Sequence, residues 1–147
     1  MFKHVLLPVD GSPVSARAIK SGVAWARDLG ATVTGYYAMP TLEHLYYGDS
    51  YIVDRGRVAS FEKLTMNDGQ KFLAKIQQAA QAAGVEYTPL LSRPATPYDG
   101  IIDAAKKQKC DVIFMASHGR GGFSSLVLGS VTQKVLAHSK IPVLVFR

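Results

Sequence analysis

Cysteine is nearly absent from this sequence: Cys110 is the only one in 147 residues, so no disulfide can form within the chain. A reducing compartment suits such a chain, and we expect a cytoplasmic protein. Long apolar runs are missing as well, since none approaches the ~20 residues that a membrane-spanning helix needs. The first apolar stretch ends at once at Asp10. It therefore predicts a strand rather than a signal peptide.

Two kinds of catalytic or metal-binding pattern are also missing. The sequence has no G-x-x-x-x-G-K-[ST] motif, and no cluster of His, Cys or acidic residues that predicts a metal site by itself. The net charge of +6 weakly favours polyanionic partners. The basic residues are scattered, however, and the densest group, Lys106–Lys109, falls at a predicted helix end, where cations suit the helix dipole. Nucleic-acid binding is therefore the weaker interpretation.

Five short apolar runs, several of them nearly unbroken, predict parallel strands covered on both faces. They are Lys3–Val9, Thr32–Ala38, Val85–Leu91, Asp111–Ala116 and Ile141–Phe146. Helical patterns lie between them, which predicts a single α/β domain over residues 1–147 with a doubly wound five-stranded parallel sheet and helices on both faces.

The helix boundaries follow from local signals. Ser12 followed by Pro13 predicts the start of the first helix, and Gly30 predicts its end. The other predicted helices span about 57–83, 97–108 and 130–139. Asp68–Gly69 is expected to loosen the middle of the second one. We interpret most of Met39–Asp54 as an irregular, tyrosine-rich loop that could cover a ligand or contact a partner.

A glycine-rich segment follows the fourth predicted strand. Gly119, Gly121 and Gly122 lie in it, and Gly129–Ser130 opens the last helix. Glycines let backbone N–H groups approach a phosphate, and a helix N-terminus adds oriented donors. In open parallel sheets, ligands bind outside the carboxyl ends of the strands. The sequence therefore predicts a nucleotide phosphate site here, which Arg120 could also contact.

Alternative roles for these residues stay open. Ser130 begins a Ser-x-x-Gln pattern and could cap its helix, bind a phosphate, or do both. Asp10 could cap the first helix or face the ligand. His118 is expected to orient the loop or face solvent rather than act as a catalytic base. Cys110 is expected to be an inert, partly buried thiol.

The chain resembles the universal stress protein family from end to end. The matching segments are Val5–Ser12, Met115–Gly119, Leu128–Val131 and Ile141–Val145. In the family's ATP binders, a glycine, two residues, a second glycine, nine residues, and a third glycine followed by Ser or Thr form the nucleotide loop. Gly119, Gly129 and Ser130 match this pattern, whereas Ala116 replaces the first glycine.

The resemblance implies a Rossmann-like sheet of strand order 3-2-1-4-5 and a set of nucleotide contacts. Pro8, Val9 and Asp10 would contact the nucleoside, and Ala38 and Met115 the adenine. The phosphates and ribose would lie against Ala116, Gly119, Gly129, Ser130 and Val131, with Ser117 and Arg120 as further candidates. The ligand would be ATP, with any Mg²⁺ or Mn²⁺ held mainly by its phosphates.

The resemblance also implies a homodimer paired through the last strand, 141–146, and a regulatory role in stress adaptation through protein partners. Two other functions stay open. One is a slow ATPase or phosphotransferase, for which Asp10 is the best candidate residue. The other is a protein that binds no ATP and acts through protein contacts alone, which the alanine at 116 favours.

Overall fold

The computed structural model describes residues 1–42, 55–119 and 127–147. These residues form one five-stranded sheet of order β3-β2-β1-β4-β5, in which all neighbouring strands are parallel. This confirms the predicted doubly wound sheet and its strand order. The strands are β1 (His4–Pro8), β2 (Thr32–Ala38), β3 (Tyr87–Ser92), β4 (Val112–Ala116) and β5 (Val143–Phe146).

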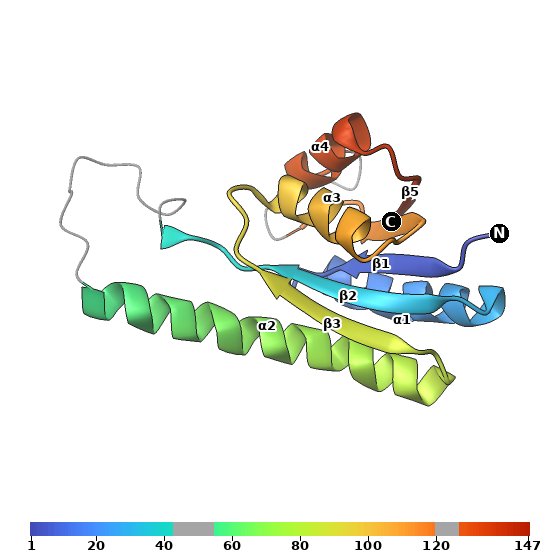
Figure 1. Cartoon of the computed structure of the whole chain (residues 1–147), viewed down its shortest axis with the longest axis horizontal. Coiled ribbons are helices and arrows are strands. Elements are labelled where there is room, and N and C mark those ends of the chain that lie inside the picture. The colour runs from blue at the N-terminus through green and yellow to red at the C-terminus, as the bar shows by residue number, and fades with distance from the viewer. Residues whose placement is uncertain (43–54, 120–126) are drawn as a thin grey trace.

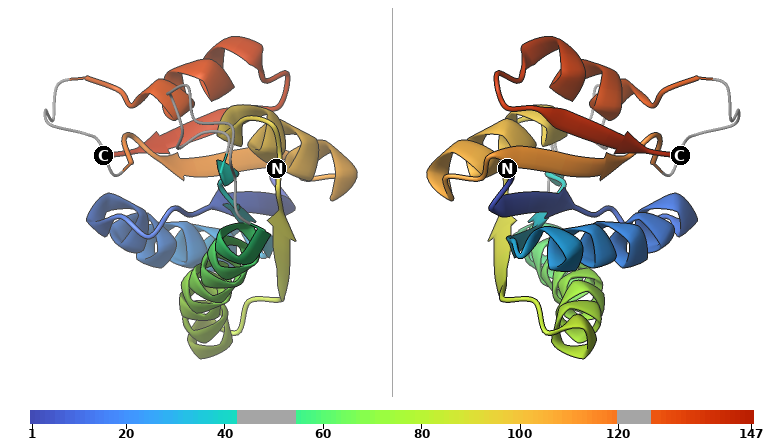
Figure 2. Two further views of the ribbon diagram at one scale, coloured as in Figure 1. Left: turned by 90° about the vertical axis from the view of Figure 1, so that its left-hand side faces the viewer. Right: turned by 90° about the vertical axis from the view of Figure 1, so that its right-hand side faces the viewer.

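Helices cover both faces of the sheet (Figure 1). Helices α1 and α2 lie on one face, and α3 and α4 lie on the other, as the two side views in Figure 2 show. The bounds are α1 (Pro13–Leu29), α2 (Arg55–Ala83), α3 (Pro97–Lys107) and α4 (Ser130–His138). Among the described residues, no helix combines the length and the apolar character required to cross a membrane.

The sheet separates two apolar cores, because successive side chains of a strand point to opposite faces. On β1, Val5 and Leu7 pack into the core under α1 and α2, while Leu6 packs into the core under α3 and α4. All three are fully buried. This burial on both faces explains why the central strands appear in the sequence as unbroken apolar runs.

Local signals set the ends of α1 as predicted. The Ser12 hydroxyl accepts a hydrogen bond from the Ser15 N–H (3.1 Å), and Pro13 takes the first helical position. Gly30 ends the helix with a φ of 64°, a left-handed conformation that glycine adopts without a steric cost.

Helix α2 corrects one prediction, because it runs unbroken through Asp68–Gly69. Gly69 is buried, and a Cβ at this position would collide with Leu91 and lie 2.6 Å from the Tyr37 ring. The glycine therefore lets α2 approach the ends of β2 and β3 rather than loosening the helix. The predicted loop before α2 falls largely on residues 43–54, outside the described residues.

Candidate functional site

A cleft of about 770 Å³ opens at the carboxyl ends of β1, β2 and β4. Strand order reverses here, since the chain builds β2 and β3 on one side of β1, and β4 and β5 on the other. The segments that follow the strands gather at this end of the sheet (Figure 1). Both the position and the volume are typical of a ligand site in an open α/β sheet.

The cleft brings together ten of the twelve predicted site residues. They come from the ends of β1, β2 and β4, from the loop after β4, and from the start of α4. These residues are Pro8, Val9, Asp10, Ala38, Met115, Ala116, Gly119, Gly129, Ser130 and Val131. Their contact with a nucleotide stays a prediction.

The other two predicted residues differ from these ten. Ser117 is buried and its backbone is used for structure, because its N–H donates to the Phe146 carbonyl (2.7 Å) and its carbonyl accepts from the Gly129 N–H (2.8 Å). Its hydroxyl lies 3.0 Å from Nδ1 of His118. Ser117 therefore joins β5, the loop and α4 instead of lining the cleft. Arg120 lies outside the described residues.

Asp10 does not cap α1, because Ser12 takes that role; it orders the loop before the helix and lines the cleft, and its contact with a ligand stays a prediction. Its Oδ1 accepts a hydrogen bond from the Ser12 N–H (2.9 Å), and its own N–H donates to Oγ of Ser15 (3.3 Å). A Cβ at Gly119 would collide with its Oδ2. The glycine thus lets the loop after β4 approach the carboxylate closely.

The start of α4 corrects the capping prediction by one residue. Gly129, with φ −61° and ψ 152°, is the N-cap, and Ser130 is the first helical residue. The side-chain amide of Gln133 donates to the Leu128 carbonyl (2.7 Å). Ser130 therefore does not cap the helix and lies exposed in the cleft.

The two matching glycines of the predicted phosphate loop lie against each other. A Cβ at Gly129 would be 3.0 Å from Cα of His118 and 3.5 Å from the Gly119 nitrogen. Thr132 fixes α4 to the sheet, since its hydroxyl donates to the Ala116 carbonyl (3.0 Å). The first N–H groups of a helix have no partner within the helix. These donors therefore adjoin the half-buried backbone of His118 and Gly119, an arrangement suited to an anion.

Ala38 and Met115 were predicted at the apolar part of the cleft, but its other apolar lining residues were not. Tyr36 and Pro40 come from β2 and the segment that follows it, Pro97 and Ile101 from α3, and Val127 and Leu128 from the segment directly before α4. The available signal was the Thr-Pro helix start after β3, which places α3 at the same edge of the sheet. Burial raises the pKa of Tyr36, whose hydroxyl lies 2.6 Å from Oγ of Ser92.

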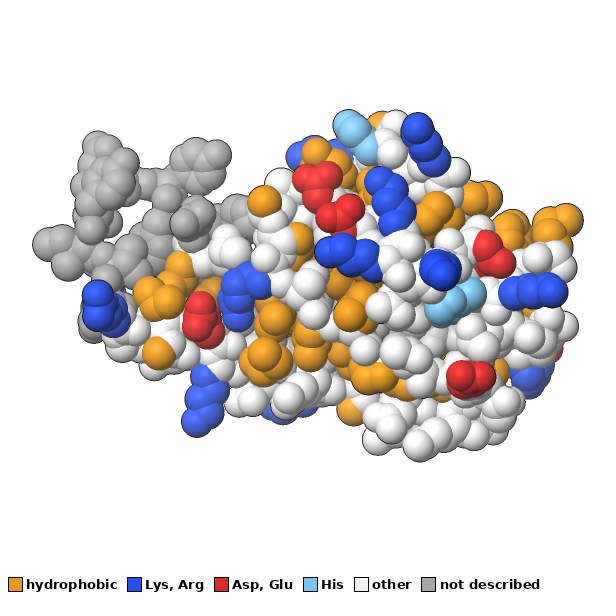
Figure 3. All heavy atoms as spheres, in the orientation of Figure 1, with side chains coloured by type: hydrophobic (Ala, Val, Ile, Leu, Met, Phe, Trp, Pro, Cys, Tyr) orange, Lys and Arg blue, Asp and Glu red, His pale blue; other side chains and the backbone are white. Residues whose placement is uncertain are grey.

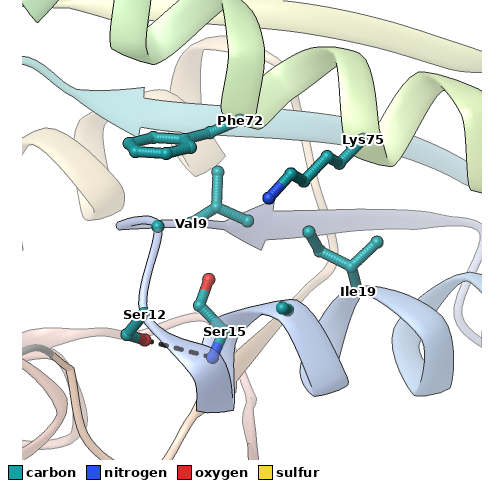
Figure 4. Close-up of a pocket in the computed structure, with 8 residues that line it drawn as sticks. Val9, Ser12, Ser15, Ile19, Phe72 and Lys75 are labelled. Atoms are coloured by element: carbon teal, nitrogen blue, oxygen red, sulfur yellow. Dashed lines mark hydrogen bonds between the residues drawn. The ribbon is translucent and has the colours of Figure 1, made fainter.

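A second, very small cavity of about 10 Å³ lies behind the Asp10 loop, between α1 and α2. Figure 4 shows Phe72 and Lys75 extending from α2 toward Val9 and the Ser12–Ser15 turn. A space of this size holds about one water molecule. It is therefore too small for a ligand, and it marks the place where α2 packs directly against the loop that carries Asp10.

Cys110 lies away from the cleft, between α3 and β4, and is more fully buried than the predicted partly buried thiol. Burial raises the pKa of its thiol to about 11, in spite of a hydrogen bond with Thr34. The thiolate is the reactive form of cysteine. The thiol therefore stays protonated and unreactive near neutral pH.

Comparison with known proteins supports one family over the whole chain. The model of the universal stress protein family matches residues 1–147. A universal stress protein of Thermus aquaticus is 32% identical, with all of both chains covered. Universal stress protein MJ0531 of Methanocaldococcus jannaschii is 30% identical over all of this chain and 83% of the relative. A solved universal stress protein from Burkholderia pseudomallei superimposes with a TM-score of 0.78 at 20% identity, covering 99% of this chain and 96% of the other. The chain therefore belongs to the universal stress protein family.

Proposed function

We propose that this protein binds adenine nucleotides, ATP foremost, in the cleft at the carboxyl ends of β1, β2 and β4. One observation carries the proposal: Gly119 and Gly129 lie against each other at the N-terminus of α4, inside a cleft of about 770 Å³. Glycine backbone beside the first N–H groups of a helix, which have no partner within the helix, favours a phosphate group.

The two ends of the cleft differ in chemistry, as the two ends of a nucleotide do. Ala38, Ile101 and Met115 supply apolar surface for a purine ring, whereas Ser130 and Val131, at the start of α4, supply backbone donors for phosphates. Asp10, which follows β1 and lies against Gly119, is the one acidic side chain among the described lining residues. A carboxylate in that place suits a ribose hydroxyl, which can donate to it.

Solved relatives give further support. One universal stress protein was crystallised in complex with cAMP, and it superimposes with a TM-score of 0.67 at 24% identity. Another, from Archaeoglobus fulgidus, was crystallised in complex with dAMP and superimposes with a TM-score of 0.68 at 18% identity. Identities this low establish a shared fold. Nucleotide binding by the present chain therefore rests on the cleft itself.

Within this proposal the protein is a regulatory binder rather than an efficient enzyme. Rapid phosphoryl transfer requires groups that hold a metal ion and align the nucleophile. Among the described residues, no group of three or more His, Cys, Asp or Glu side chains could hold a metal ion. A divalent ion would therefore be held mainly by the ATP phosphates, with Asp10 as the carboxylate that the described residues place in the cleft. In this role, nucleotide occupancy would change the surface offered to protein partners.

The test is calorimetric titration of nucleotide-free protein with ATP, with and without Mg²⁺, beside GTP as a control for the base. We expect saturable binding of ATP and weaker binding of GTP. If ATP does not bind, the protein acts through protein contacts alone. Phosphate release that Asp10→Asn abolishes while ATP still binds would instead favour the ATPase. Affinity for nucleic acid that falls steeply with salt would indicate a polyanion binder, although Lys and Arg side chains are scattered on the face shown in Figure 3.

We further propose that two subunits pair through β5. This strand lies at the edge of the sheet, and its four apolar residues are only half-buried. The carbonyls of Pro142 and Phe146 accept hydrogen bonds from the N–H groups of Ile113 and Ser117. Because backbone groups alternate along a strand, those of Val143 and Val145 point to the open edge, where a second copy could pair with them.

Val145→Pro is expected to weaken the dimer at least about tenfold, because it removes an N–H that faces the partner while leaving the bonds to β4 intact. Val145→Thr keeps both the N–H and the branched Cβ, and serves as the control. Sedimentation velocity over a concentration series measures the effect. A Val145→Pro protein that dimerises like the unmodified chain would exclude pairing through this edge.

A further inference from the structure

Arg93, directly after β3, joins three parts of the fold beside the cleft. Its Nη1 donates to the Pro40 carbonyl (2.9 Å), in the segment that leaves β2. Its Nη2 makes a longer contact with Oγ1 of Thr65 on α2 (3.5 Å) and lies 3.9 Å from the Met39 sulfur. One guanidinium group therefore ties the ends of β2 and β3 to the middle of α2.

The acceptors that the described residues offer to Arg93 are all neutral. They are a carbonyl, a hydroxyl and a thioether. Thr65 is buried, with 4% of its surface exposed. Its hydroxyl donates to the Glu62 carbonyl (3.1 Å), and the hydroxyl oxygen can still accept from Arg93. Arg93 has a planar fork of several donors. Through these contacts the fork fixes the positions of Pro40, Met39 and Thr65, and none of the three carries a negative charge.

Pro40 connects this cluster to the cleft. The N–H of Met39 donates to the Ser92 carbonyl (2.8 Å), so the β2–β3 ladder continues one residue past Ala38. Pro40 has no N–H, and its carbonyl is therefore its one backbone group for hydrogen bonding. Arg93 takes this carbonyl. Pro40 lines the cleft beside Ala38, whereas Arg93 does not.

We infer that Arg93 is a positioning residue: it holds Pro40 where the cleft receives the base, and so sets the affinity for the nucleoside part of the ligand. This inference rests on the proposed nucleotide binding. It differs from a direct attraction between the Arg93 charge and the phosphates, because the contact runs through Pro40 at the apolar end of the cleft. The two effects can be separated with a ligand that has no phosphate.

The experiment titrates ATP and adenosine into the unmodified protein and into Arg93→Met, which keeps an unbranched, flexible side chain and loses the guanidinium donors. We expect affinity for both ligands to fall about tenfold, the equivalent of losing a hydrogen bond to a charged donor. Arg93→Lys keeps the charge but has a single ammonium group as donor. Its affinities should lie between those of the unmodified protein and of Arg93→Met. Lys107→Met removes an exposed cation from the far end of α3 and should change neither affinity.

Each other outcome has a defined meaning. Unchanged binding in Arg93→Met, or a loss for ATP alone, would overturn the positioning role while nucleotide binding stands. If the unmodified protein binds neither ligand, the proposed function fails and this inference fails with it. Thr65→Val provides a milder variant in case Arg93→Met folds poorly, since it removes one of the contacts and keeps the shape of the side chain. It should lower the affinity for both ligands by less than Arg93→Met does. Affinities for ATP and adenosine equal to those of the unmodified protein would count against the inference.

Discussion

Replacing Gly129 by glutamate is expected to lower the affinity for ATP at least about 100-fold. Gly129 is the N-cap of α4, and a Cβ there would lie 3.0 Å from Cα of His118, so the new side chain disturbs the loop that carries Gly119. Its carboxylate would also repel the phosphates at the same helix end. Loss of a charge-assisted hydrogen bond and the added repulsion each contribute about 1–3 kcal/mol, and about 2.7 kcal/mol already corresponds to 100-fold.

The matched control is Ala137→Glu, which adds the same charge to the exposed side of the same helix, two turns further on. It should bind ATP like the unmodified protein, and calorimetry measures both variants. If Gly129→Glu keeps full affinity for ATP, the phosphates do not lie at the start of α4. Circular dichroism separates this result from a failure to fold.

The second large effect is expected from Gly100→Val on α3, which should lower the free energy of unfolding by about 3 kcal/mol or more. Gly100 is buried, and a Cβ there would collide with the Tyr36 hydroxyl and lie 2.6 Å from Cγ of Pro94. Neither neighbour moves easily, because the Tyr36 ring is fully buried and the Pro94 ring is rigid. The helix must therefore shift away from the sheet.

Asp103→Val, on the exposed side of the same helix, introduces the same side chain without a collision. Its cost should stay below about 1 kcal/mol, the range of helix propensities. Urea denaturation measures both variants. Because Ile101 and Tyr36 line the cleft, Gly100→Val should also weaken ATP binding. A loss of stability no larger than that of the control would show that α3 adjusts freely over the sheet.

The strands and the first helix could be predicted because their signals are local. Buried parallel strands give unbroken apolar runs, and Ser12, Pro13 and Gly30 each carry a conformational preference of their own. Gly69 shows where this reasoning fails. An Asp-Gly pair usually favours a turn, but here Tyr37 and Leu91 need the space above the glycine. Those two residues belong to strands β2 and β3, whereas Gly69 lies on α2, so their positions follow from tertiary packing.

The candidate site divides in the same way. The phosphate end could be predicted because glycines, a strand end and a helix start follow one another in the chain. Even there, the cap proved to be Gly129 rather than Ser130, since a Ser-x-x-Gln pattern does not establish which residue adopts the capping conformation. At the apolar end only Ala38 and Met115 were predicted; Pro97 and Ile101 could not be, because they approach the cleft only once α3 is packed on the sheet.

The alternation of side chains along the sheet has a thermodynamic consequence. Val9 and Tyr37 belong to the core under α1 and α2, Ile101 and Met115 belong to the core under α3 and α4, and all four line the cleft. A nucleotide held there would contact both layers at once and would be absent from the unfolded chain. Such linkage adds about 2.7 kcal/mol of stability at a ligand concentration of 100 times Kd. Resistance of the whole protein to heat and to proteases would then rise and fall with the nucleotide level.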